Sequence, residues 1–158
     1  MRVFWKQKWI AVLFLFIIML TITGIKIREC FQQSQFSLTC TAYRIRTNKL
    51  REPIRILQLT DLHNSIFGDN NRDLIELVAE QEPDLIVITG DLLNSGEERT
   101  DVAVSLITDL VKIAPIYVSL GNHEVEYQEN FGTDIVNLYE TAGAVVMDKQ
   151  YQDISVKD

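Results

Sequence analysis

The chain has 158 residues, 47% of them hydrophobic, which is enough for one domain of ordinary size and excludes an intrinsically disordered chain. Residues 1–30 hold five basic side chains and one acidic side chain, whereas residues 31–158 hold 10 basic and 21 acidic, so we expect no binding to nucleic-acid phosphates. The two cysteines, Cys30 and Cys40, are too few for a disulfide scaffold or a zinc ribbon, although they could form one bridge in an oxidising compartment.

An apolar segment at residues 9–25 carries no charge between Lys8 and Lys26. As a helix it would be about 25 Å long, slightly short for a hydrocarbon core of about 30 Å. Its basic flanks can snorkel, and Trp5 and Trp9 suit the headgroup region. We therefore predict that this segment is a single transmembrane anchor.

The flanks of this segment also predict its orientation. More basic residues precede it than follow it, which places residues 1–8 in the cytoplasm. Residues 26–35 are then a connector, and residues 36–158 form a domain outside the cell membrane. A cleaved secretory signal is the alternative, but residues 21–23 offer only a weak cleavage site, so we expect an uncleaved anchor.

Alternating strand and helix patterns occupy the rest of the chain. The period-2 and period-3.6 spacing of apolar residues distinguishes the two kinds of element. We predict strands at residues 36–45, 54–59, 85–88, 116–120, 145–147 and 153–156, a loop at 48–53, and helices at 73–81, 101–113 and 131–141. This order predicts an α/β fold in which right-handed βαβ units build a largely parallel sheet flanked by helices.

Three short polar turns follow the three central strands, at residues 61–63, 90–91 and 121–124. Ligands of open α/β sheets bind at the carboxyl ends of the strands, so we expect the turns to meet there. Asp61 and His63 are two residues apart, which in extended backbone puts both side chains on one side. Each turn alone is also typical of a helix cap or a simple turn. The only two histidines of the chain, however, both lie in these turns.

These turns carry the ligand types of a transition-metal site. Mixed carboxylate and imidazole ligands suit Mn, Fe or Zn better than Ca²⁺. Asp91 can bridge two metal ions, and Asn122 offers an uncharged amide oxygen. His123 diverges from its neighbour, so we expect it to transfer a proton or contact a phosphate. Glu124 could orient a histidine.

Taken together, the turns resemble the calcineurin-like metallophosphoesterase family, over residues 54–146. The matching blocks are Asp61-Leu62-His63, Gly90-Asp91 and Gly121-Asn122-His123-Glu124. With its apolar segment, the chain is also similar to a membrane-associated bacterial branch of that family, some members of which act on envelope lipids or nucleotides. The resemblance implies an αββα sandwich and a phosphomonoester or phosphodiester substrate.

Carried over by residue, the resemblance implies two divalent metal ions. Asp61 and His63 would hold the first ion, Asp91 would bridge the two, and Asn122 would hold the second. His123 would contact the scissile phosphate or protonate the leaving oxygen. A hydroxide activated by the dinuclear metal centre would attack phosphorus.

The chain departs from the family pattern after His123, because no later histidine supplies the isolated His and the Gly-His-x-His block. We therefore expect a truncated reading frame or a partial sequence, with residues 145–156 a stub of the second sheet. These 158 residues alone should bind metal weakly and hydrolyse little or nothing. A catalytically inactive anchored fragment, or a module that binds phosphate or a partner, is the alternative. A Rossmann domain is disfavoured because no Gly-x-Gly-x-x-Gly follows a strand.

Overall fold

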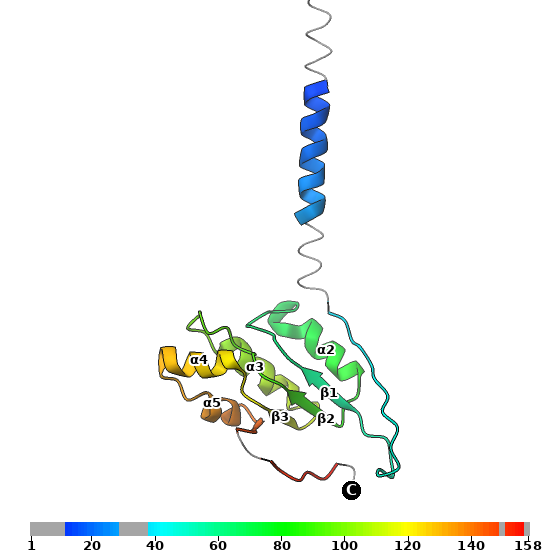
Figure 1. Ribbon diagram of the computed structural model, residues 1–158, viewed down its shortest axis with the longest axis vertical. Helices are drawn as coiled ribbons and strands as arrows, with labels where there is room; N and C mark the ends of the chain where they lie inside the picture. The colour runs from blue at the N-terminus through cyan, green and yellow to red at the C-terminus, as the bar shows by residue number, and fades with distance from the viewer. Residues whose placement is uncertain (1–11, 29–37, 149–150, 157–158) are drawn as a thin grey trace, which may run out of the picture. The chain divides into compact units, whose positions relative to one another are not determined.

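A computed structural model describes residues 12–28, 38–148 and 151–156 (Figure 1). The chain divides into two compact units, Met1–Thr39 and Cys40–Asp158.

The described part of the first unit is chiefly one helix at residues 12–28, all of whose side chains are exposed. Within the described residues, no helix combines the length and the apolar character needed to cross a membrane. The first residues of the predicted anchor at 9–25 lie outside the described residues. Residues 1–8 and most of the connector at 26–35 also lie outside them. The anchor and the placement of the domain outside the cell membrane stay predictions.

The second unit contains a parallel sheet of four strands in the order β1-β2-β3-β4 (Figure 1). The strands are β1 (Ile56–Leu59), β2 (Leu85–Ile88), β3 (Ile116–Val118) and β4 (Val145–Val146). Every neighbouring pair is parallel. The predicted α/β fold with a parallel sheet is therefore confirmed, and the carboxyl ends of all four strands lie at one edge.

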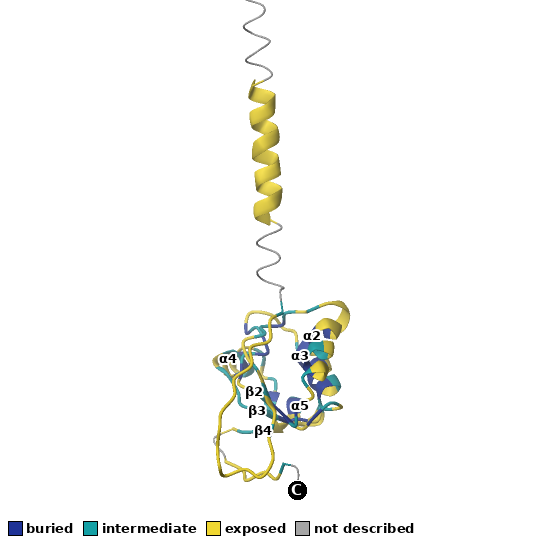
Figure 2. Cartoon of the chain, turned by 90° about the vertical axis from the view of Figure 1, so that its right-hand side faces the viewer, coloured by how far each residue is buried: buried dark blue, intermediate teal, exposed yellow. Residues whose placement is uncertain are grey.

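Helices connect the strands of this sheet. They are α2 (Arg72–Glu80), preceded by the short 3₁₀ helix η1 (Asp69–Asn71), α3 (Asp101–Leu110), α4 (Asn122–Phe131) and α5 (Ile135–Thr141). Figure 2 shows α2 and α3 on the same side of the strands, and α3 contacts both α2 and α5. Ile86, Ile88 and Val118 are fully buried. Side chains alternate between the two faces of a strand, and those on the other face are more exposed: Ile56 is 59% exposed and Val145 is 39% exposed. The buried apolar side chains form the core that holds the strands in place.

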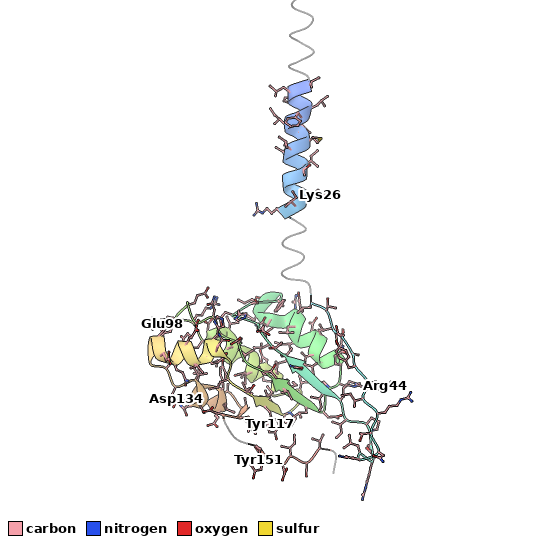
Figure 3. The ribbon with its side chains drawn as sticks, viewed as in Figure 1. Lys26, Arg44, Glu98, Tyr117, Asp134 and Tyr151 are labelled. Atoms are coloured by element: carbon pink, nitrogen blue, oxygen red, sulfur yellow. The ribbon has the colours of Figure 1, made fainter. Side chains whose placement is uncertain are left out.

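Three predicted elements differ from the structure. Residues 38–45, the described part of the predicted strand at 36–45, form no strand, because no neighbouring strand pairs with them and nearly all their side chains are exposed. Arg44 projects away from the sheet in Figure 3. Residues 153–156 form no strand either. The β4 strand, predicted as part of a second sheet, instead extends the first one, because Tyr117 and Val118 pair with it.

The helix predictions were more accurate. The predictions at residues 73–81 and 101–113 are confirmed as α2 and α3, although α3 ends at Leu110. The predicted helix at 131–141 begins only at Ile135. The sequence did not predict α4, because its only buried side chains are Glu124 and Tyr127, so it has no apolar stripe.

Candidate metal centre

The turns after β1 and β2 are joined by backbone hydrogen bonds. The Asp61 N–H donates to the Gly90 carbonyl at 3.3 Å, and the His63 N–H donates to the Asp91 carbonyl at 2.9 Å. The Asn64 N–H continues the series to the Leu92 carbonyl at 2.8 Å. The two turns therefore run side by side past the ends of their strands, as their sequence positions predict.

The turn after β3 approaches the turn after β2 closely because both carry glycine. A Cβ on Gly90 would lie 2.6 Å from the Gly121 Cα, and a Cβ on Gly121 would collide with the Asp91 carboxylate. The Asp91 Oδ1 in turn accepts a hydrogen bond of 3.0 Å from the His123 N–H, at the first turn of α4. Gly90 also has a φ of 90°, which favours glycine. Glycine at these two positions therefore permits the close approach of the two turns.

The structure brings His63, Asp91 and His123 together. One potential ligand atom from each residue lies within 4.8 Å of the others, and the two imidazole rings meet edge to face with centroids 4.5 Å apart. All three residues are partly buried. Two imidazoles and a carboxylate are a donor set that fits Mn, Fe or Zn. We call these three residues the His-Asp-His group.

The remaining predicted site residues lie around this group. The Asp61 Oδ1 is 3.9 Å from the His63 Nε2, and its other oxygen accepts a hydrogen bond from the Thr60 hydroxyl at 2.7 Å. Asn122 is the exposed first residue of α4. The roles of Asp61 and Asn122 stay predictions. His123, expected to act on protons or phosphate, lies beside His63 and Asp91, so its position is also compatible with metal binding.

Backbone conformation also marks this site. Asp61, His63 and Asp91 have φ angles of 55°, 46° and 55°, in the left-handed region that residues other than glycine rarely occupy. Such conformations cost of the order of 1 kcal/mol each and persist where surrounding structure enforces them, often at functional sites. Here the hydrogen bonds between the turns enforce them.

Glu124 positions the turns of the site by accepting hydrogen bonds from their backbone N–H groups. It is completely buried and accepts hydrogen bonds from the N–H groups of Gly121 and of residues 91–93, at 2.8 to 3.1 Å. The Tyr139 hydroxyl of α5 donates a fifth, at 3.2 Å. Burial, and then the nearby Glu124 charge, raise the pKa of Tyr139. The expectation that Glu124 orients a histidine is wrong in this structure, because both carboxylate oxygens are occupied by these five donors.

One neighbour of the group was not predicted from the sequence. Ser95 contacts the His123 ring, yet it lies 28 residues earlier in the chain and belongs to no recognisable motif. Only the packing of α4 against the loop after β2 brings the two residues together.

Comparison with known proteins identifies the family of this chain. Residues 54–155, more than half of the chain, match the Calcineurin-like phosphoesterase family. An uncharacterized metallophosphoesterase of Campylobacter jejuni is 32% identical over 55% of this chain and 24% of its own length. Phosphodiesterase YaeI of Escherichia coli is 37% identical over 46% of this chain and 28% of its own length.

The metallophosphoesterase YkoQ of Bacillus subtilis, also uncharacterized, is 26% identical over 64% of this chain and 38% of its own length. The chain thus spans between a quarter and two fifths of the length of these relatives. The family match includes all three turns and the sheet that positions them. The chain belongs to the calcineurin-like phosphoesterase family.

Proposed function

We propose that this protein hydrolyses a phosphoester in a metal-dependent reaction at the carboxyl edge of its sheet. The observation that carries the proposal is the convergence of the His-Asp-His group from three separate turns. A structural role alone would not require two imidazoles and a carboxylate to face one another at a partly exposed edge. Membership of the family supplies the reaction class.

We propose the roles that the sequence predicts for two divalent ions. Asp61 and His63 would hold one ion, Asp91 would be shared, and Asn122 would hold the other. When bound, the ions supply an activated water and neutralise phosphate charge. The domain is acidic, so bound cations also make the edge attractive to an anionic substrate. His123 contacts the phosphate or donates a proton to the leaving oxygen.

A phosphodiester is the substrate class that we favour. The Escherichia coli relative, with the highest identity of the three proteins compared, carries the name phosphodiesterase. A simple aromatic diester tests this class without assuming a natural substrate, whether an envelope lipid or a nucleotide-like molecule.

Metal removal tests the proposal. We expect the purified protein to hydrolyse bis(p-nitrophenyl) phosphate slowly at saturating Mn²⁺, because the family's later histidines are absent from these 158 residues, and we expect EDTA to lower this rate at least tenfold. Adding Mn²⁺ in excess of EDTA should restore the rate, because bound ions would activate the attacking water. A carboxylic ester, p-nitrophenyl acetate, serves as the control for general esterase activity. A diester rate that is indifferent to EDTA would contradict the proposal.

A further inference from the structure

Ser95 contacts the His123 ring at its Nδ1. Its backbone N–H lies 3.2 Å, and its Oγ 3.0 Å, from the His123 Nδ1. Ser95 is only 8% exposed, so water competes little for these contacts. The same residue therefore offers a donor and an acceptor to one ring nitrogen. An Nδ1 without a proton accepts the backbone N–H, whereas an Nδ1 that carries a proton donates to the Oγ, so one of the two contacts is a hydrogen bond in each state of the ring.

Glu126 completes this arrangement. The Ser95 hydroxyl donates to the Glu126 Oε2 at 2.8 Å. An ionised carboxylate only accepts hydrogen bonds, so the single hydroxyl proton of Ser95 is used there, and the Oγ presents its lone pairs to the His123 Nδ1. Glu126 lies three residues after His123 on α4, so both side chains occupy one face of the helix.

A residue of the next turn of α4, Asn130, also holds the backbone of Ser95. The Asn130 side-chain amide donates to the Ser95 carbonyl at 3.2 Å. Neighbouring residues of the loop are held by Glu124, which accepts the N–H groups of Leu92 and Leu93. The loop after β2 and α4 are thus connected at several points, and Ser95 has little freedom to move away from the ring.

We infer that Ser95 and Glu126 are positioning residues that fix the His123 imidazole and leave its Nε2 for a metal ion or a phosphate. The inference deepens the proposed function, and its kinetic consequences rest on it. Residues that orient a ligating or reacting histidine through its second nitrogen commonly change affinity or activity by about 10-fold to 100-fold. Neither residue lies in the three sequence blocks that identified the family.

Kinetics of four variants test the inference in the active protein. We expect Ser95→Ala to lower kcat for bis(p-nitrophenyl) phosphate about 10-fold to 100-fold while KM changes less than about twofold. Ser95→Thr, which keeps the hydroxyl, should recover most of the loss. Glu126→Gln should lower kcat less, about threefold to tenfold, since an amide oxygen can still accept the serine proton. Glu129→Gln removes the same charge from an exposed position on α4 and is the matched control.

An NMR measurement separates this inference from the proposed function. The chain has two histidines, so the two imidazole signals are assigned by comparison with His123→Ala. In Ser95→Ala, the His123 ring signal should move toward that of an unrestrained histidine and sharpen. An unchanged ring signal in both Ser95→Ala and Glu126→Gln would overturn the inference, even if hydrolysis were observed. If the wild-type protein shows no metal-dependent hydrolysis, the proposed function fails, but the ring signal still decides the positioning role.

Discussion

Asp91→Asn is expected to lower metal-dependent hydrolysis of a phosphodiester by about 10³-fold, equivalent to roughly 4 kcal/mol of transition-state stabilisation. Asp91 supplies the carboxylate of the His-Asp-His group. Asparagine keeps the shape and the oxygen that accepts the His123 N–H, but it removes the negative charge. The loss should therefore appear in the rate and not in the fold. Initial rates at saturating Mn²⁺ measure it.

The matched control is Asp69→Asn, which removes one negative charge at an exposed position outside the group. Its rate should equal that of the wild type. The free energy of unfolding of Asp91→Asn should stay within about 1 kcal/mol of the wild type, as is usual for changes outside the core. A rate for Asp91→Asn within threefold of the wild type would show that this carboxylate takes no part in the reaction.

Glu124→Ala is expected to have the largest effect on stability, lowering the free energy of unfolding by about 3 to 5 kcal/mol. The substitution leaves five donors without their acceptor, four of them backbone N–H groups of the turns that carry Asp91 and precede His123. A buried donor without a partner costs about 1 to 3 kcal/mol, although water entering the space left by the side chain should satisfy some of the five. Urea denaturation measures the change.

Two further variants separate the contribution of the Tyr139 hydroxyl from the loss of stability expected for any truncated glutamate on α4. Tyr139→Phe removes only the hydroxyl donor and should cost about 1 kcal/mol. Glu129→Ala truncates an exposed glutamate on the same helix and should change stability by less than about 0.5 kcal/mol. If Glu124→Ala and Glu129→Ala proved equally stable, the hydrogen bonds to Glu124 would not hold the turns together.

The sheet could be predicted because its central strands, β2 and β3, are apolar and largely buried, and because Pro83 and Pro115 each stand just before one of them. Period-2 alternation at residues 38–45 failed as a signal, since a strand also needs a partner that supplies hydrogen bonds. The sequence did not predict the α4 helix, for the opposite reason. Its stability rests on contacts of buried Glu124 and Tyr127 with other segments, which no local apolar pattern reveals.

The candidate site could be predicted to a similar extent. Asp61, His63 and Asp91 were recognisable because each follows a strand, and parallel strands end at one edge. The part played by Glu124 could not be deduced, because a glutamate at a helix start is as compatible with a capping residue as with a buried anchor. Ser95 carries no local signature, and its contact with His123 depends on the three-dimensional packing of α4.

The most direct test of this account is a titration of the metal-free protein with Mn²⁺, followed by electron paramagnetic resonance of the free ion. We predict that the wild-type protein binds Mn²⁺ and that His63→Ala and Asp91→Asn each weaken binding at least tenfold, because each removes a ligand of the His-Asp-His group. Asp69→Asn should bind as the wild type does. Equal Mn²⁺ affinity in all four proteins would contradict the claim that the turns at the carboxyl edge of the sheet form a metal centre.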